Sequence, residues 1–276
     1  MQSVNGKKVL ITGAAMGMGK IYAQLAVAEG AAAVVLWDIN QQALDATAAE
    51  LKAKGGKIFT YIVDVSSKDA VMAAAEKVKQ EAGDIHIVFN NAGIVRGKYF
   101  WEHSDADIWL SMAINSLAPM YIARAFLPKM IAGTDECRIV NIASAAGTVA
   151  NPKMSVYCAS KWAVIGWSDS LRLELVKAGY PQVRVTTVCP GYISTGMFEG
   201  AKGPLMTPIM TPEYVVDRVW AAMKAGQPML MLPWTVRLGT MMRGLLPLAL
   251  WDWVAEHVFG VYKSMDEFKG REPQKH

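Results

Sequence analysis

A tyrosine and a lysine, Tyr157 and Lys161, stand four residues apart at the start of a stretch of helical character near 156–178. Residues at this spacing project from the same face of a helix, so the ammonium group can lie beside the phenol. A neighbouring positive charge favours the phenolate, and a tyrosine whose free pKa is about 10 then becomes a usable acid or base nearer neutrality. The pair predicts proton transfer, although the same spacing also occurs for structural reasons alone.

Two further polar residues can join this pair. Ser144 comes shortly after the strand-like segment 138–142, and strand ends are where open α/β sheets bind their ligands, so Ser144 and Tyr157 can converge. Asn115 stands in a long helix candidate near 104–131, where a buried polar side chain needs a hydrogen-bond partner. Taken alone, Ser144 would be a loop hydroxyl or a helix cap.

Three glycines, Gly13, Gly17 and Gly19, lie between a strand-like segment at 8–12 and a helix candidate near 18–29. Glycines let the backbone turn tightly and approach a pyrophosphate, whose negative charge the exposed N–H groups at the helix start can bind. This position favours a dinucleotide site over a merely structural turn.

Asp38 ends the second strand-like segment. A carboxylate there can accept hydrogen bonds from both adenosine ribose hydroxyls and would repel a 2′-phosphate. Neither Met16 nor Ile39 is basic, and the nearest cation, Lys20, can equally be a solvated residue of the first helical turn. We therefore predict NAD in preference to NADP.

The elements that must position these residues alternate regularly along the chain. Strand-like segments are expected at 8–12, 33–37, 58–63, 85–89, 138–142, 183–188 and 228–232. Helices are expected near 18–29, 40–54, 67–82, 104–131, 156–178 and 211–225. This order predicts an α/β fold of one domain over 1–276, a doubly wound (Rossmann) parallel sheet of about seven strands with helices on both faces.

The last third of the chain changes character. Residues 190–212 are rich in Gly, Pro, Thr and Met and predict a mobile substrate loop over the site. The apolar C-terminal extension, 234–276, is interrupted by charged residues and is too short in uncharged length for a membrane span. Its stretch 234–260 could be a flap over the substrate, a dimer surface or a segment lying on a membrane; membrane contact is the less favoured alternative.

The composition excludes several other classes of protein. The net charge is +4 over 276 residues with the Lys and Arg residues scattered, which argues against a nucleic-acid partner. Three cysteines without CxxC spacing indicate a reducing compartment and no metal site. The chain start has no signal-peptide pattern, so we expect a mature protein that begins at Met1 and is cytoplasmic.

Asn115, Ser144, Tyr157 and Lys161 resemble, in order and spacing, the catalytic tetrad of the short-chain dehydrogenase/reductase family. The Thr-Gly-x-x-x-Gly-x-Gly turn at 12–19 resembles the turn of that family as well. The resemblance implies that the tyrosine exchanges a proton with the substrate oxygen and the serine hydrogen-bonds that oxygen. The lysine would lower the tyrosine pKa and hold the nicotinamide ribose, and the asparagine would anchor a water on the proton path.

Other motifs extend this resemblance over residues 7 to about 232, including the strand-end motifs at 64–65 and 90–93 and the motif at 190–195. It implies a homodimer or homotetramer. Ala143 replaces the second serine of many members, and the chain continues beyond a minimal member's tail. The resemblance assigns cofactor contacts to Gly13, Met16, Gly17, Met18, Gly19, Asp38, Ile39, Asp64, Val65, Asn91, Ala92, Gly93, Tyr157, Lys161, Pro190, Gly191, Ile193 and Thr195.

Large apolar side chains in the segments expected around the substrate predict a bulky, apolar secondary alcohol or ketone, such as a steroid-like, aryl or lipid-like compound. A rival function is reduction of a sugar or an acyl-thioester ketone, which requires a cationic groove from Arg96, Lys98 and Lys202. Another rival is a non-catalytic NAD-binding family member, which would usually have lost the tyrosine or the lysine. The expected lining residues are Ala145, Met154, Tyr192, Met197 and Phe198, with Tyr99, Phe100, Trp101 and Trp234 as further candidates.

Overall fold

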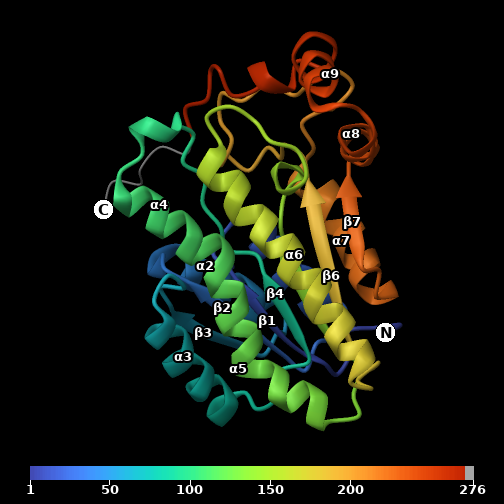
Figure 1. Ribbon diagram of the computed structural model, residues 1–276. Coiled ribbons are helices and arrows are strands. Elements are labelled where there is room, and N and C mark those ends of the chain that lie inside the picture. Colours follow the sequence, from blue (N-terminus) through green and yellow to red (C-terminus); the bar gives the residue numbers. More distant parts are fainter. Residues whose placement is uncertain (271–276) are drawn as a thin grey trace.

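The computed structural model describes residues 1–270, and its centre is one parallel sheet (Figure 1). Its seven strands lie in the order β3-β2-β1-β4-β5-β6-β7, and every neighbouring pair is parallel. This confirms the expected doubly wound fold of about seven strands. The strands are β1 (Lys8–Thr12), β2 (Ala33–Asp38), β3 (Ile58–Ile62), β4 (Ile87–Asn90), β5 (Cys137–Ile142), β6 (Val183–Pro190) and β7 (Met229–Leu232).

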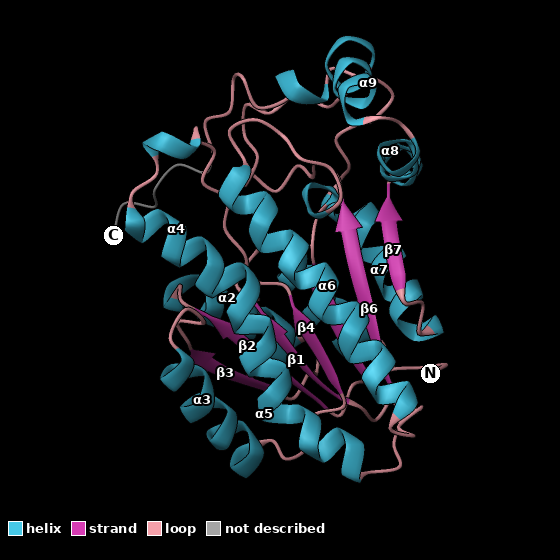
Figure 2. Cartoon of the chain, in the orientation of Figure 1, coloured by secondary structure: helices cyan, strands magenta, loops and turns pink. Residues whose placement is uncertain are grey.

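Helices cover both faces of the sheet (Figure 2). One face carries α1 (Gly17–Ala28), α2 (Gln41–Ala53) and α7 (Pro212–Ala225), and the other carries α3 (Lys68–Glu81), α4 (Asp105–Met112), α5 (Ala118–Ala132) and α6 (Ser155–Lys177). Side chains of one strand alternate between the two cores: Val9 and Ile11 pack on the first face, whereas Leu10 packs on the second.

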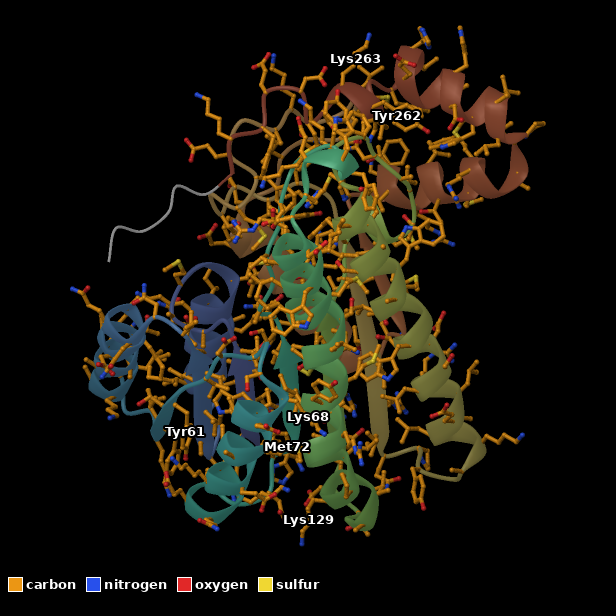
Figure 3. All side chains as sticks on the ribbon, turned by 60° about the vertical axis from the view of Figure 1, so that its left-hand side comes forward. Tyr61, Lys68, Met72, Lys129, Tyr262 and Lys263 are labelled. Carbon is orange, nitrogen blue, oxygen red and sulfur yellow. The ribbon has the colours of Figure 1, made fainter. Side chains whose placement is uncertain are left out.

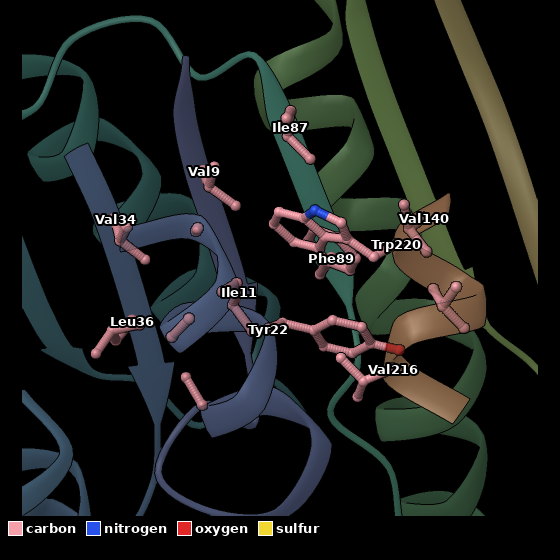
Figure 4. Packing of buried hydrophobic residues seen from close by; sticks show 14 of the residues in the cluster. Val9, Ile11, Tyr22, Val34, Leu36, Ile87, Phe89, Val140, Val216 and Trp220 are labelled. Carbon is pink, nitrogen blue, oxygen red and sulfur yellow. The ribbon is translucent and has the colours of Figure 1, made fainter. Parts of the chain in front are cut away.

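Aromatic rings fill the first core beneath the nucleotide end of the sheet (Figure 4). The rings of Tyr22 and Phe89 stack with their centroids 4.5 Å apart, and Phe89 stacks on Trp220 at 5.7 Å. These contacts join α1 and α7 to the centre of the sheet. They hold the start of α1 at the carboxyl end of β1, where the glycine turn lies.

The expected long helix at 104–131 contains a turn of π-helix, Ala113–Leu117, between α4 and α5. The helical run from Asp105 to Ala132 is long and apolar enough to cross a membrane by length and composition. However, 56% of its apolar 18-residue window is buried inside the protein. It packs against α3 and α6, as a core helix does.

The extension beyond β7 is folded. It forms α8 (Trp234–Leu245), α9 (Leu248–Trp253), a π-helical turn (Val254–Val258) and a 3₁₀ turn (Val261–Lys263), all beyond the carboxyl ends of β6 and β7 (Figure 1). Figure 3 shows Tyr262 and Lys263 at this end of the molecule and Lys129 at the opposite end. The part of the extension after residue 270 lies outside the described residues.

The middle part of the segment 190–212 is hydrogen-bonded to this extension. The Lys202 N–H donates to Ser264 O at 2.9 Å, the Leu205 N–H donates to Phe259 O at 2.8 Å, and the Lys269 N–H donates to Glu199 O at 2.9 Å. Extension and loop therefore form one layer over the carboxyl edge of the sheet.

Candidate active site

The glycine turn connects β1 to α1 at the carboxyl edge of the sheet. Gly13 has a positive φ of 63°, and a Cβ added to Gly19 would lie 2.0 Å from Gly13 O, so α1 can pack on the turn only with glycine at that position. The N-cap residue Met16 makes no side-chain capping bond, and the first turn of α1 holds no acidic residue. The turn therefore fits a pyrophosphate bound at a helix N-terminus.

Thr12 ties this turn to the end of β4. Its hydroxyl oxygen accepts hydrogen bonds from the N–H groups of Asn91 and Ala92, both at 3.0 Å. The Asn91 amide in turn donates to Thr12 O at 2.9 Å and to Gly13 O at 3.2 Å. Asn91 and Ala92 were expected to contact the cofactor, but no role was expected for Thr12. The buried Thr12 hydroxyl holds the glycine turn against the segment after β4.

The carboxylate of Asp38 lies beside the same turn. Its Oδ2 accepts a hydrogen bond from the Ala15 N–H at 2.9 Å and its Oδ1 accepts one from the Asn40 N–H at 3.0 Å. Ile39 is 68% exposed, and the Lys20 ammonium forms an ion pair with Glu50 at 2.8 Å.

Asp64 and Val65 follow the end of β3 on the same side of the sheet. Oδ1 of Asp64 accepts hydrogen bonds from both the N–H and the hydroxyl of Ser66, at 2.9 and 2.6 Å. These bonds fix the turn that leads into α3, which is the ordinary role of a polar residue in a strand-ending turn.

The four residues of the expected tetrad are all buried and come from three elements. Ser144 follows β5, Tyr157 and Lys161 lie one turn apart on α6, and Asn115 lies in the π-helical turn. Ser144 and Tyr157 line the same pocket, and the Ser144 hydroxyl is close enough to lower the pKa of the phenol. The Lys161 ammonium donates to Ile142 O at 2.8 Å and lies 5.7 Å from the centroid of the Tyr157 ring.

Asn115 is held by a set of mutual hydrogen bonds. Its Oδ1 accepts from the Ile94 N–H at 2.9 Å, and its Nδ2 donates to Ile94 O at 2.9 Å and to Ser160 Oγ at 3.1 Å. A Cβ on Gly93 would lie 3.3 Å from Asn115 Oδ1 and 3.6 Å from Lys161 Nζ. Asn115 therefore joins the segment after β4 to α6, and the glycine lets the backbone pass close to the lysine.

Burial dominates the protonation of the pair on α6. It raises the pKa of the Tyr157 phenol, which the Ser144 hydroxyl lowers only in part. Burial also lowers the pKa of Lys161 to about 8. The Lys161 ammonium donates to a backbone carbonyl, and both groups have lost their hydration, so burial is the main cause of both pKa shifts.

Two cavities meet at Ser144. The smaller, about 60 Å³, is lined by Tyr157 and Lys161 together with expected cofactor residues: Met18, Asn91, Gly93, Pro190, Gly191, Ile193 and Thr195. The larger, about 120 Å³, is lined by Ala145, Met154, Tyr192 and Phe198, four of the five expected substrate-lining residues. Ser144, Gly191 and Phe198 line both cavities, whereas Met197 lines only the smaller of these two.

The extension supplies much of the wall of the larger cavity, and a flap over the substrate was one of the alternatives expected for 234–260. Eight residues of the extension line this cavity, and the sequence did not single them out individually. The residues are Thr235, Val236, Leu238, Gly239, Trp251, Phe259, Val261 and Ser264.

Four aromatic residues expected near the substrate do not line the larger cavity. Trp101 is 78% exposed and stacks on Tyr99 with ring centroids 4.8 Å apart, and Phe100 lies in the same outward-facing 3₁₀ turn. Trp234 is 61% exposed at the start of α8. That part of the prediction was wrong, because an apolar residue type does not reveal the direction in which its side chain points.

The sequence profile described as "short chain dehydrogenase" matches residues 7–203. The chain belongs to this family. It is 36% identical over 273 residues to epidermal retinol dehydrogenase 2 of Mus musculus, which covers 98% of this chain and 87% of that protein. It is 37% identical over 246 residues to estradiol 17-beta-dehydrogenase 11 of Homo sapiens, covering 89% of this chain and 81% of that protein.

Solved structures of short-chain dehydrogenases share the fold. A short chain dehydrogenase/reductase from Burkholderia phymatum in complex with NAD aligns with a TM-score of 0.81 at 26% identity, covering 88% of this chain and 95% of that one. A metagenomic short-chain oxidoreductase in complex with NADP aligns with a TM-score of 0.69 at 30% identity, covering 83% and 95%. The family identity makes this chain an oxidoreductase of the NAD(P)-dependent type.

Proposed function

We propose that this short-chain dehydrogenase transfers a hydride between NAD(H) and a bulky, apolar secondary alcohol or the corresponding ketone. The observation that carries the proposal is the position of Ser144. It lies close to Tyr157 and in the walls of both the apolar cavity and the pocket that contains Lys161. A substrate oxygen at this point would face the proton donor from one side and the cofactor pocket from the other.

The residues present fit a dinucleotide. The uncapped start of α1 and the close packing at Gly19 would hold the pyrophosphate, Asp38 would hold the adenosine ribose, and Lys161 would hold the nicotinamide ribose. The nicotinamide, when bound, supplies the site that accepts or donates the hydride.

The protein's own residues then orient the substrate and move its proton. The hydroxyls of Ser144 and Tyr157 hold the substrate oxygen in one position, and Tyr157 gives or takes its proton as the carbon changes oxidation state. The Lys161 ammonium favours negative charge on Tyr157 during that step, and Asn115 fixes the helix on which both residues lie.

A Tyr157→Phe variant tests the proton transfer. We expect turnover to fall at least about 100-fold, the usual contribution of general acid–base catalysis, while the dissociation constant for NADH stays within a few-fold of the native value. Tyr214→Phe, at an exposed tyrosine on α7, is the control and should keep full turnover. Native turnover in Tyr157→Phe would refute the assignment.

NAD is favoured over NADP by the charges around the adenosine end. The Asp38 carboxylate is fixed by two N–H groups, Ile39 presents no charge, and Lys20 is engaged by Glu50. We expect NADH to bind at least tenfold more tightly than NADPH in a fluorescence titration. Asp38→Ser should narrow this ratio and Asp45→Ser, at an exposed position on α2, should not. Tighter binding of NADPH by the native protein would contradict the proposal.

The substrate class follows from the lining of the larger cavity, which is mainly aliphatic and aromatic. The cations needed by the sugar or acyl-thioester alternative are already paired: Arg96 and Lys98 with Asp107 at 3.5 and 2.9 Å, and Lys202 with Glu267 at 2.5 Å. In a panel of graded alcohols, bulky steroid-like secondary alcohols should be oxidised with higher kcat/KM than polyols. Faster turnover of small polyols would refute this class.

A further inference from the structure

Three polar side chains stand together in the mainly apolar wall of the larger cavity. Asn151 lies in the loop before α6, Tyr192 lies just after β6, and Ser264 lies at the end of the extension. These segments, distant in sequence, meet at the carboxyl end of the sheet (Figure 1). The Tyr192 and Ser264 hydroxyl oxygens are 2.8 Å apart, and Asn151 Nδ2 lies 2.8 Å from Ser264 Oγ and 3.3 Å from Tyr192 Oη.

The direction of each hydrogen bond follows from a single contact. Ser264 Oγ lies 2.6 Å from Val261 O, and a carbonyl oxygen can only accept, so the one serine proton is used there. Tyr192 must then donate to Ser264, and Asn151 must present its amide nitrogen to the same oxygen. The orientation of the Asn151 amide is thereby fixed by the network.

This arrangement leaves the cluster with acceptor capacity and no spare hydroxyl donor. Asn151 Oδ1 is buried and has no hydrogen-bond partner among residues 1–270, and Tyr192 Oη retains a lone pair. Burial raises the pKa of Tyr192, so its phenol stays protonated and continues to donate to Ser264. A buried acceptor without a partner is unfavourable, and a ligand that donates a hydrogen bond to it removes that penalty.

The cluster is connected to the reacting centre through Phe198. The Phe198 ring lies edge-on to Tyr157 at 6.0 Å and edge-on to Tyr192 at 5.3 Å, so it separates the two phenols. Ser144 and the cluster line the same cavity. One ligand can therefore contact Ser144 with its reacting oxygen and the cluster with a second group.

We propose that Asn151, Tyr192 and Ser264 form a second polar subsite that accepts a hydrogen bond from a hydroxyl on the non-reacting part of the substrate. This rests on the proposed function, and it narrows the substrate class to bulky apolar alcohols or ketones that carry an additional hydroxyl. A ketone or a hydrogen atom at that place offers no proton, so compounds of those two kinds bind less well.

Three compounds with one carbon skeleton test the subsite: the same reacting alcohol with a distal hydroxyl, a distal ketone or a distal hydrogen. For the native protein saturated with NADH, the hydroxyl compound should have a dissociation constant about tenfold lower than the other two, as expected for one hydrogen bond to a buried acceptor. The kcat/KM values with NAD should follow the same order.

Asn151→Leu removes the free acceptor with little change in volume, and Tyr192→Phe removes the second acceptor but keeps the ring beside Phe198. In each variant, the ratio of the dissociation constants of the ketone and hydrogen compounds to that of the hydroxyl compound should fall toward one. If Asn151→Leu does not fold, Tyr192→Phe still supplies the comparison. The control is Tyr121→Phe, at a half-buried tyrosine on α5 far from the cavity lining, and its preference should equal the native one.

Equal binding of the three compounds by the native protein, or tighter binding of the ketone, would overturn the subsite. So would variants that weaken all three compounds equally. Binding is measured without turnover. A protein that binds the hydroxyl compound selectively but oxidises none of the three would therefore refute the proposed function while supporting the subsite.

Discussion

Replacing Lys161 by methionine should change the free energy of unfolding of the cofactor-free protein by an amount that depends on pH. Lys161 is buried on α6, and burial lowers its pKa from 10.5 to about 8. The native fold therefore disfavours the proton that this lysine carries in the unfolded chain. Methionine retains a long apolar side chain and removes the charge.

The sign and size of the effect follow from the two pKa values. Below pH 8 the lysine is protonated in both states, so the folded protein bears the full cost of the buried charge. Between about 8 and 10.5 the unfolded chain binds more protons, so the native free energy of unfolding rises with pH. At about 1.4 kcal/mol per pKa unit, the total rise is at most ~3.5 kcal/mol.

The Ile142 carbonyl loses its donor in the variant, which costs about 1–3 kcal/mol at every pH. The informative quantity is therefore the change of the variant-minus-native difference with pH. It should fall by about 1–3 kcal/mol between pH 7 and pH 10.5. Tyr157 is present in both proteins, so the effect of its own titration largely cancels from this difference.

Urea unfolding at half-unit pH steps measures this difference. Lys177→Met, at an exposed lysine in the last turn of the same helix, is the control and should give a nearly constant difference over the range. A Lys161→Met difference that is equally flat would show that the native lysine keeps its ordinary pKa. The electrostatic account of the site would then be wrong.

Three further substitutions have outcomes that the packing decides. Gly19→Ala places a methyl group 2.0 Å from a backbone oxygen, so it should lower the free energy of unfolding by more than about 2 kcal/mol and weaken NADH binding at least tenfold. Its control is Gly166→Ala, in open space on α6, which should raise the free energy of unfolding in urea by about 0.5–1 kcal/mol. Tyr22→Phe removes a buried hydroxyl without a partner and keeps the ring stack, so the free energy of unfolding should rise by about 1 kcal/mol; a loss of that size would show that the hydroxyl is hydrogen-bonded. Asn115→Ala removes the amide bonds to Ile94 and to the Ser160 hydroxyl and should cost about 2–3 kcal/mol, with a parallel fall in kcat; an unchanged melting curve would contradict this.

The central strands were predictable because they are short runs rich in β-branched residues that are buried on both faces. The expected strand at 8–12 is β1, and the one expected at 183–188 extends to Pro190 as β6. The long helix at 104–131 was also expected, but its π-helical turn was not. That turn depends on the bonds between Asn115 and the segment after β4, and local sequence carries no signal for such long-range contacts.

Within the site, the relative positions of the catalytic residues were predictable from the sequence, but their pKa shifts were not. The step from Tyr157 to Lys161 is local, so helix geometry alone places the two residues on one face. The approach of Ser144 follows from the rule that parallel strands end at one edge. The directions of the Tyr157 and Lys161 pKa shifts did not follow from the sequence, because they depend on how deeply the pair is buried and on Ile142 O as an acceptor for the ammonium.

The sequence by itself determined the doubly wound fold and the residues around the expected nucleotide turn, because these depend on strand order, glycine spacing and helix periodicity. Only the tertiary structure decided what encloses the substrate. The three exposed rings at 99–101 face outward, whereas Trp251, Phe259 and Ser264 face the cavity. Hydrophobic composition predicts that a segment is buried, but side-chain direction depends on how the extension folds back over the sheet and bonds to the loop at 190–212.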